Sequence, residues 1–472
     1  MSVTLDIHLR RDSPEPLFVQ LSDQVRRCVV AGKVHHDLPL PPSRVLASEL
    51  GVSRSTVLSA YEQLVAEGYI VGRRGSGYYA RPLSDAESLP PRRVARQSVD
   101  EMPVDSTPLQ HPGYPDNRLF PYRQWARSLA RSARVAPRAL IVSDSPFGDS
   151  SLRRAIADYL AEWRGLEISP RQVMVTAGSV DALETCIRTL TGPGDVVGLE
   201  NPGYRPLRNL VVNQGMEIEW LPVGRNGAEL PRATPDRSPT RLAVVTPSHQ
   251  FPLGGAMPAN RRLEYQRWAS ANDAWIVEDD YDSEFRYAGR PIPALASLDE
   301  AERSIYVGTF SKVFSVSLRL AYLIMPSALI DDFGRSLSRY GVRAALPCQR
   351  PLADFIDSGD FYRHIRRVRR IYAERRKLLL ECLQRRLGDR LEYEDYQAGM
   401  QIAVRLAPGL DDRAIAAQAR QRGVVLAPLS SYYGNPGEPA VQGLLLGFCP
   451  LNEAEIRTSV EVLGDIIDAM DH

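Results

Sequence analysis

One lysine stands in a run of hydroxyl residues, Thr309-Phe310-Ser311-Lys312, and Arg319 follows it seven residues later. A lysine amine can form a Schiff base with an aldehyde cofactor, and hydroxyl groups with a nearby arginine can bind a phosphate. Lysine is rare in this chain, since only Lys33, Lys312 and Lys377 occur among 472 residues. A surface lysine is the ordinary alternative, so this chemistry depends on what other segments contribute.

A second segment offers a phosphate site where an apolar run ends. Residues 173–176 predict a strand, and the chain then passes through Gly178, Ser179 and Val180 into a helix expected from about Asp181. Backbone N–H groups at the start of a helix bind phosphate oxygens. A plain turn before a capped helix would give the same pattern.

Two further strand ends carry groups that suit a ring-shaped cofactor. The run Glu278-Asp279-Asp280-Tyr281 closes an apolar strand, and ligands of open α/β sheets bind at such ends. A carboxylate there can pair with a protonated ring nitrogen. Tyr204 follows another strand in the run Asn201-Pro202-Gly203-Tyr204 and can stack on a ring. The bland alternatives are a solvated acidic cluster and a core tyrosine.

These residues need an α/β domain with a mostly parallel sheet to position them. After about residue 107, strand-like runs alternate with helical patterns, which is typical of that fold class. The expected strands cover residues 173–176, 196–199, 242–245, 275–278 and 305–307. The sequence therefore predicts a head over residues 1–81, a linker over 82–107 rich in proline and arginine, and a body over 108–472.

The head has the pattern of a small helical module followed by a hairpin. Apolar residues at helical spacing predict a helix from Leu17 that ends before Gly32, and Ser43 is expected to cap a short helix over 44–50. Ser53 is expected to cap the next helix, and glycines in 69–79 predict a hairpin. This arrangement has helix-turn-helix length and turn chemistry.

The same head carries a local positive charge. From Arg26 to Arg81 eight basic residues stand against four acidic ones, a balance of 8 − 4 = +4, whereas the whole chain has a net charge of +1. The helix that Ser53 caps would enter a major groove of DNA with its first residues. The hairpin tip would then contact the DNA as a wing. The DNA-contact candidates are Ser43, Arg44, Ser53, Arg54, Ser55, Thr56, Arg73, Arg74 and Gly75.

The composition argues against disulfide-rich, zinc-binding, membrane-spanning and secreted proteins. The five cysteines, Cys28, Cys186, Cys348, Cys382 and Cys449, have neither disulfide-framework nor zinc-ligand spacing, so we expect reduced thiols and no metal site. No apolar run has the ~18 residues of a membrane span, and the N-terminus lacks the apolar block of a signal peptide. A cytoplasmic protein is expected.

The head resembles the winged helix-turn-helix of GntR-type bacterial repressors. The resemblance lies in LPPSRVLASELGVSRSTVLSAYEQLVAEGYIVGRRGSGYYA, within residues 16–80. It implies that the segments around Ser43-Arg44, Ser53 to Thr56 and Gly75-Ser76-Gly77 contact operator DNA.

The body resembles fold-type I aminotransferases, whose cofactor is pyridoxal 5'-phosphate (PLP). The resemblance runs from about Pro108 to the C-terminus and includes Pro146-Phe147-Gly148 and Pro252-Leu253-Gly254. It implies that Lys312 forms the Schiff base and that Asp279 pairs with the pyridine nitrogen. It further implies ring contacts from Tyr204 and Tyr281. The implied phosphate ligands are Gly178, Ser179, Val180, Thr309, Ser311 and Arg319.

A GntR-like head on an aminotransferase-like body resembles the MocR/GabR subfamily, as do the strings EDDYDSEFRY and TPSHQFPLGG. The resemblance implies a head-to-tail, domain-swapped homodimer that binds operator DNA. It also implies sensing of a small amine, an amino acid or a related effector through the body.

Three positions depart from the aminotransferase pattern. Phe251 stands where an Asn usually bonds the ring oxygen, so Gln250 or Tyr281 would take that role. Leu445 stands where an Arg usually binds the substrate carboxylate, and Ser143 replaces an aromatic residue. Other arginines could bind an effector anion instead. The candidates are Arg118, Arg205, Arg208 and Arg343, with the loop 428–433 on the effector side.

The chain keeps the residues that bind the cofactor but has Leu445 in place of the arginine that usually binds the substrate carboxylate. This combination favours sensing of a ligand over catalytic turnover. The leading hypothesis is a PLP-dependent transcription regulator, as repressor or activator, with a residual transaminase half-reaction left open. One alternative is a working aminotransferase with an accessory DNA-binding head. Another is a repressor whose body has lost its cofactor and only dimerises.

Overall fold

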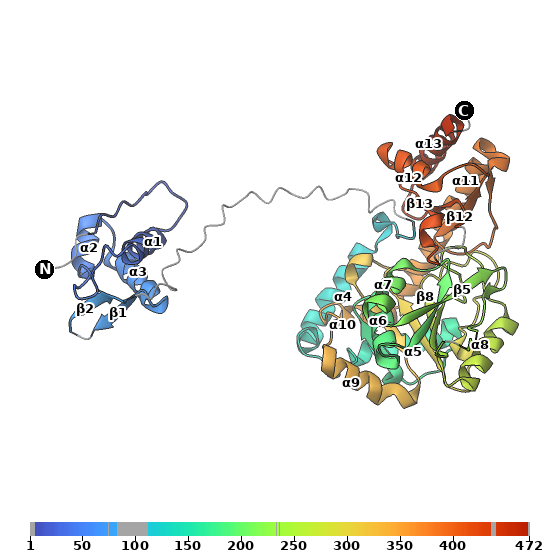
Figure 1. Cartoon of the computed structure of the whole chain (residues 1–472), viewed down its shortest axis with the longest axis horizontal. Coiled ribbons are helices and arrows are strands. Elements are labelled where there is room, and N and C mark those ends of the chain that lie inside the picture. Colours follow the sequence, from blue (N-terminus) through green and yellow to red (C-terminus); the bar gives the residue numbers. More distant parts are fainter. Residues whose placement is uncertain are drawn as a thin grey trace. The chain divides into compact units, whose positions relative to one another are not determined.

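A computed structural model describes residues 5–73, 75–82, 112–232, 234–235, 237–435 and 440–470. The chain forms two compact units, Met1–Val104 and Asp105–His472 (Figure 1). Among the described residues, no helix combines the length and apolar character that a membrane span needs.

The first unit is a three-helix head with a two-stranded wing. Its helices are α1 (Leu17–Val30), α2 (Ser43–Leu50) and α3 (Arg54–Ala66). The antiparallel strands β1 (Ile70–Arg73) and β2 (Gly77–Ala80) follow, with Arg73 opposite Gly77 at the tip. Leu21, Val25 and Val57 form the centre of its core. Burial of one apolar face from each helix therefore holds the three helices together.

The second unit is built around an eight-stranded sheet in the order β3-β10-β9-β8-β7-β4-β5-β6. The strands β4, β5, β7, β8 and β9 pair in parallel, whereas β3, β10 and β6 pair antiparallel. The bounds are β3 (Val173–Thr176), β4 (Val196–Asn201), β5 (Glu217–Gly224), β6 (Gly227–Ala228), β7 (Thr240–Val245), β8 (Trp275–Asp280), β9 (Ser304–Thr309) and β10 (Ala321–Ile324).

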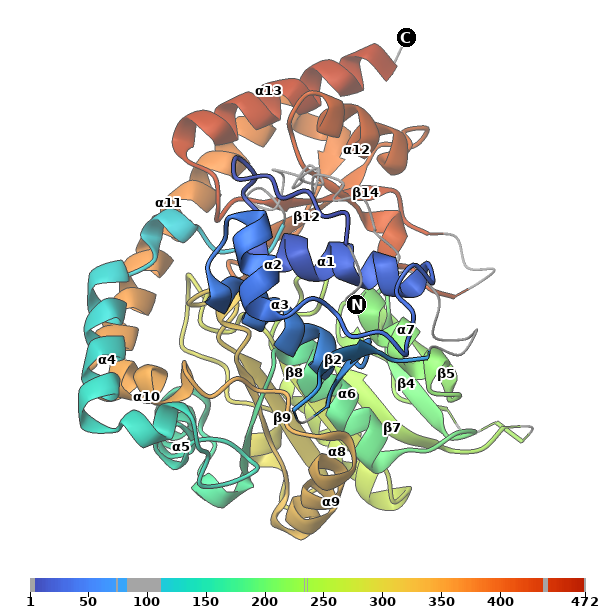
Figure 2. The ribbon, with the colours of Figure 1, turned by 90° about the vertical axis from the view of Figure 1, so that its left-hand side faces the viewer.

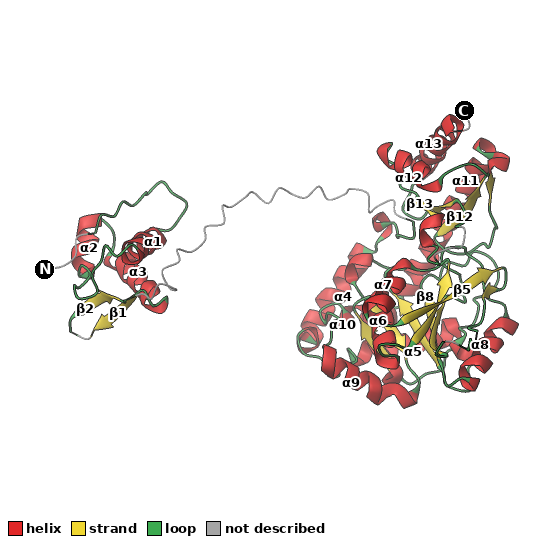
Figure 3. Cartoon of the chain, viewed as in Figure 1, coloured by secondary structure: helices red, strands yellow, loops and turns green. Residues whose placement is uncertain are grey.

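Helices cover both faces of this sheet (Figure 3). Alternate residues of one strand show this directly, because Met174 packs with α6 and α9 while its neighbours Val173 and Val175 pack with α5. The helices are α4 (Tyr122–Val135), α5 (Ser150–Arg164), α6 (Ser179–Leu190), α7 (Arg205–Asn213), α8 (Ala259–Ala271), α9 (Ile330–Tyr340) and α10 (Gln349–Asp357).

The C-terminal lobe is a smaller antiparallel sheet with three helices. Its strands lie in the order β11-β12-β14-β13. Helix α13 packs along α11 and α12 (Figure 2). The bounds are α11 (Asp360–Arg386), β11 (Leu391–Glu392), β12 (Gln401–Leu406), α12 (Asp412–Gln421), β13 (Ala427–Pro428), β14 (Gly443–Gly447) and α13 (Glu453–Met470).

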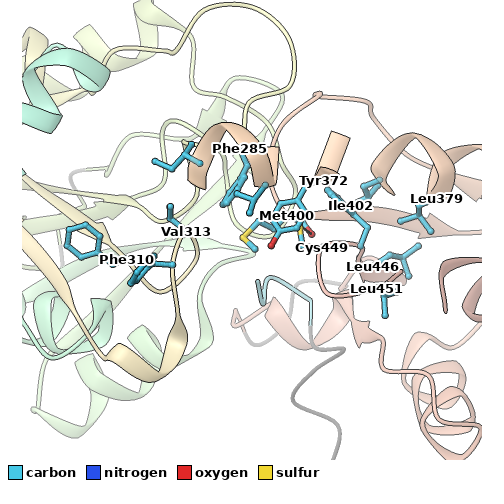
Figure 4. Close-up of a cluster of buried hydrophobic side chains, with 14 of the residues drawn as sticks. Phe285, Phe310, Val313, Tyr372, Leu379, Met400, Ile402, Leu446, Cys449 and Leu451 are labelled. Atoms are coloured by element: carbon cyan, nitrogen blue, oxygen red, sulfur yellow. Dashed lines mark hydrogen bonds between the residues drawn. The ribbon is translucent and has the colours of Figure 1, made fainter. Parts of the chain in front are cut away.

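One apolar cluster joins the large sheet to the C-terminal lobe. Figure 4 shows Phe310 and Val313, which flank the predicted Schiff-base lysine, on one side of it. Ile402 and Leu446 of the smaller sheet lie on the other side, with Tyr372 of α11 between them. The lysine loop is therefore anchored in the core that holds the lobe in place.

Most predicted elements form, with two differences at helix starts. Helix α2 begins at Ser43 itself, after Pro42, and no side chain caps it, so the prediction that Ser43 is the N-cap is wrong. Pro42 ends an extended proline segment and its carbonyl accepts the first helical N–H groups. Helix α6 begins at Ser179, two residues before the expected start.

Candidate functional site: a cofactor pocket and a DNA-reading head

The register of the large sheet brings the predicted phosphate ligands together. Ala321 of β10 pairs with Thr176 of β3 on one side and with Thr309 of β9 on the other. The C-terminal ends of β3 and β9 therefore lie on either side of the start of β10, at the same end of the sheet. This places the following predicted ligands at that end: Gly178, Ser179, Val180, Thr309, Ser311 and Arg319.

Local geometry opens this end toward a ligand. Gly178 has φ of 100°, a conformation that favours glycine, and it turns the chain from β3 into the first N–H groups of α6. The Ser311 N–H donates to Thr309 Oγ1 at 3.1 Å, which fixes the start of the lysine loop. Arg319 has a left-handed φ of 51° directly before β10. A non-glycine residue held in that conformation is often found at a functional site.

Lys312 is half-buried in the loop that follows β9. Its Nζ donates to the Gly113 carbonyl oxygen at 3.0 Å and lies 5.8 Å from the centre of the Tyr114 ring. Burial lowers the pKa of the Lys312 amine, while Asp282 and Asp279 oppose that shift. A lowered pKa leaves more of the neutral, nucleophilic amine at neutral pH.

Asp279 is the buried carboxylate that faces the pocket. Burial, together with the negative charges of Asp280 and Glu200, raises the pKa of Asp279 to about 7. Its Oδ1 atom has no hydrogen-bond partner among the described residues. A buried carboxylate without a partner is costly, and a protonated ring nitrogen would satisfy it. The residues here thus fit a pyridinium ring.

The neighbours of Asp279 on β8 face the other side of the sheet. Asp280 forms a buried ion pair with Arg164 at 2.9 Å. Glu278 accepts backbone N–H groups of Leu295 and Ala296, each at 3.0 Å. The run of three acidic residues is therefore not a solvated cluster, and only its middle member serves the pocket.

Aromatic side chains form one wall of the pocket. The Phe251 ring contacts the rings of Tyr204, Tyr281 and Tyr432 edge to face, at centroid distances of 5.9, 5.7 and 5.2 Å. Burial raises the pKa of Tyr204 to about 12, and Asp279 adds to this shift while Arg319 opposes it. Tyr204 therefore lies within electrostatic reach of both the predicted ring anchor and the predicted phosphate anchor.

The structure adds two pocket residues to the predicted set. Glu200 is the last residue but one of β4. It accepts from the Thr246 N–H at 3.1 Å and from Gln250 Nε2 at 3.0 Å, and burial raises its pKa to about 7. His249 contacts Tyr281 and Asp282 through Nδ1. A signal for Glu200 existed, because an acidic residue ends a buried strand there as at Asp279.

The structure also shows where Leu445 and the four candidate arginines lie. Leu445 is buried in β14 opposite Ala403. Arg118 pairs with Asp116, and Arg343 pairs with Glu184. Of the four arginines considered for an effector anion, Arg205 and Arg208 line a small cavity with Asp279 and Tyr432.

In the head, the predicted DNA contacts cluster at the start of α3. Ser53 Oγ caps this helix by accepting from the Thr56 N–H at 3.1 Å. Arg54 Nε donates to Ser43 Oγ at 3.4 Å, which joins the starts of α2 and α3. Arg44, Arg54 and Ser55 are exposed on this surface.

The wing carries the remaining predicted DNA contacts. The Arg73 guanidinium lies 4.2 Å from the centre of the Tyr79 ring at the wing tip. Gly75 is exposed with φ of 78°, which suits the hairpin turn. Arg74 lies outside the described residues.

Comparisons with known proteins agree with both halves. Residues 114–443 match the family Aminotransferase class I and II, and residues 17–79 match the family Bacterial regulatory proteins, gntR family. The probable rhizopine catabolism regulatory protein MocR of Rhizobium meliloti is 39% identical, covering 98% of this chain and 96% of that protein. The chain belongs to the MocR/GabR subfamily of GntR-type regulators.

One more curated relative and one solved structure agree with this assignment to the MocR/GabR subfamily. The pyridoxine biosynthesis transcriptional regulator PdxR of Corynebacterium glutamicum is 36% identical, covering 100% of this chain and 99% of that protein. The structure of an archaeal alanine:glyoxylate aminotransferase is 26% identical with a TM-score of 0.70, and it covers 76% of this chain and 90% of that one. The predicted subfamily and fold class are confirmed.

As a member of this subfamily, the chain is a PLP-dependent, DNA-binding transcription regulator. PLP supplies an aldehyde and an electron-accepting ring when it is bound. The pocket residues match its three parts, with Lys312 for the aldehyde, Asp279 for the ring nitrogen and Arg319 at the phosphate edge. The individual site assignments and the boundaries 1–81, 82–107 and 108–472 stay predictions.

Proposed function

We propose that this regulator senses a small molecule with a primary amine at Lys312. The effector amine and the Lys312 amine would compete for the same aldehyde, so effector binding frees the lysine side chain inside the pocket. The observation that carries this proposal is the position of Lys312 Nζ on a half-buried side chain. Among the described residues, the hydrogen bond of this Nζ goes to a backbone carbonyl, that of Gly113, at 3.0 Å. A displaceable amine in a pocket can report ligand binding as a local change of charge and packing.

The substrate side of the pocket supports sensing rather than turnover. Leu445 offers an effector carboxylate no charge, and a buried carboxylate without a partner costs several kcal/mol. Arg205 and Arg208, which line the cavity with Asp279, are the arginines best placed to bind an effector anion. We therefore expect an effector whose acidic group lies away from Leu445 and β14 of the smaller sheet.

We further propose that the regulator works as a domain-swapped homodimer in the cytoplasm. The linker over residues 82–107 is long enough for a head to dock on a partner body. Large apolar side chains are exposed next to α4, with Val135 75% and Ile141 78% exposed, and a second copy of the chain would cover them. Sedimentation of the full chain at several concentrations tests this, and a monomer throughout would contradict it.

The sensing proposal is tested with operator DNA and a panel of amines. Effector and operator must favour different conformations for sensing to work, and a coupling of ~1–3 kcal/mol changes operator affinity ~5–150-fold. Lys312→Ala should abolish the effector response and keep basal operator binding. Lys377→Ala, at an exposed lysine, is the matched control. A full response in Lys312→Ala would overturn the proposal.

A working aminotransferase remains the second candidate, because the pocket keeps the cofactor anchors. Arg205 or Arg208 would then have to replace the missing arginine of β14. Incubation of the purified protein with amino donors and a keto acid decides between the two. Sustained product formation beyond one equivalent of protein would favour the enzyme.

A further inference from the structure

A second cleft of about 390 Å³ lies between the large sheet and the C-terminal lobe. This volume falls within the usual range for small-molecule sites, roughly 300–1,000 Å³. One wall comes from the β5–β6 hairpin and from the turn at 250–255, and the other comes from β11, β12 and the segment after them. Gln250, one of the two candidates for the bond to the ring oxygen, lines it, whereas the residues assigned to the aldehyde, the ring nitrogen and the phosphate of PLP do not.

Charged side chains from both walls face this cleft. Arg225 belongs to the hairpin, whereas Arg405 belongs to β12. Glu392 of β11 pairs directly with Arg405 in the sheet register, so both side chains project from the same face. Within the part of the chain that the structure describes, Arg225, Arg405 and Glu392 form no side-chain hydrogen bond or ion pair.

The two arginines line the same cleft as one tyrosine, Tyr396. Burial raises the pKa of Tyr396 to about 12, with a further rise from its bond to Glu394, while Arg405 and Arg225 oppose this shift. Both arginines therefore lie within electrostatic reach of the Tyr396 hydroxyl, although they come from different lobes. Two unpaired positive charges that converge in a cleft favour an anion.

We propose that this cleft is a second ligand site that binds a small zwitterion, with its carboxylate between Arg225 and Arg405 and its positive nitrogen beside Glu392. The adjacent opposite charges of Arg405 and Glu392 suit a molecule whose two charges lie one or two carbons apart. Tyr393 and Tyr396 add aromatic rings for the cationic group. Val223, Leu253 and Leu429 offer apolar surface to the uncharged part of the ligand.

A ligand here would act on the cofactor pocket through Gln250. Its Oε1 accepts from the Leu253 N–H at 3.0 Å on the cleft side, and its Nε2 donates to Glu200 at 3.0 Å on the pocket side. Gly254 approaches Tyr396 closely, since a Cβ there would lie 3.1 Å from the ring. A ligand bound in the cleft would therefore hold the turn at 250–255 in one position. That turn carries Phe251, whose ring contacts Tyr204 and Tyr281 in the cofactor pocket.

The test uses zwitterions that cannot react with an aldehyde. Glycine betaine and trimethyl-β-alanine carry a quaternary nitrogen, so any binding is independent of the sensing proposal at Lys312. Calorimetric titration of the full PLP-bound chain should show saturable binding in wild type and in Lys312→Ala. Arg225→Gln/Arg405→Gln should weaken it at least tenfold. Arg232→Gln, where the arginine pairs with Glu229 outside the cleft, should leave it unchanged.

Glu392→Gln separates a zwitterion site from a simple anion site. It should weaken binding of both betaines and leave the affinity for acetate unchanged. Equal binding of acetate and the betaines in wild type would overturn the proposal. So would the absence of saturable binding by either betaine up to ~10 mM, or binding that survives loss of both arginines.

Discussion

The hydroxyl of Tyr281 lies 2.9 Å from Nδ1 of His249. The same nitrogen lies 3.0 and 3.1 Å from the two carboxylate oxygens of Asp282, and all three side chains are buried or nearly so. A Cβ at Gly399 would lie 2.0 Å from His249 Cε1, so only glycine leaves space for the ring there. The contact with His249 orients the Tyr281 hydroxyl. Phe251 cannot bond a ring oxygen, so Tyr281 is one of the two residues, with Gln250, that would take that role.

His249 should therefore act on the cofactor through Tyr281. We expect His249→Leu to weaken PLP binding about threefold to tenfold, the worth of one hydrogen bond. His249→Asn keeps a polar atom near the Nδ1 position and should restore most of the affinity. In a double-mutant cycle with Tyr281→Phe, the two losses should not add. Additive losses in PLP titrations would show that the histidine has no part in orienting the tyrosine.

Lys312→Ala should remove covalent attachment of PLP and keep the fold. The phosphate edge and Asp279 remain, so non-covalent binding persists at lower affinity. Absorbance spectra and mass spectrometry after borohydride reduction measure the covalent adduct. The adduct should persist in Lys377→Ala, because that side chain is 80% exposed on α11. A reducible adduct in Lys312→Ala would assign the chemistry to another residue.

Sequence patterns predicted the strand ends that build the pocket but not every group in it. The residues from 275 onward predicted both the strand and the carboxylate of Asp279, because an apolar run and an acidic residue near its end are local signals. Glu200 has the same signal, yet its role depends on Thr246 and Gln250 from other strand ends. The pairing of Glu392 with Arg405 depends on the register of two strands, which local patterns do not specify.

Arg54→Ala should weaken operator binding by about 1–3 kcal/mol if the guanidinium contacts a base, and by less if it meets only phosphate. If Arg54 contacts a phosphate, its loss in Arg54→Ala would also lower the salt dependence of binding by about one ion. Arg26→Gln is the control, because Arg26 is paired with Glu67 inside the head. Gel-shift titrations at several salt concentrations measure both quantities. Unchanged affinity and unchanged salt dependence would exclude Arg54 from the interface.

In the cofactor-free protein, Asp279 should make a contribution to stability that falls as pH rises. The pKa of Asp279 is about 7 in the folded chain and 3.8 ordinarily, so between these values only the folded state holds the proton. The free energy of unfolding therefore falls as pH rises from about 4 to about 7, by on the order of 4 kcal/mol from this group. Asp279→Asn removes this dependence, so its stability gain in urea unfolding should grow by about 2–3 kcal/mol between pH 5 and pH 8. Glu300→Gln, at an exposed residue, should show no such growth. An equal gain for Asp279→Asn at both pH values would mean that the carboxylate is not the buried, unpaired group that awaits the ring nitrogen.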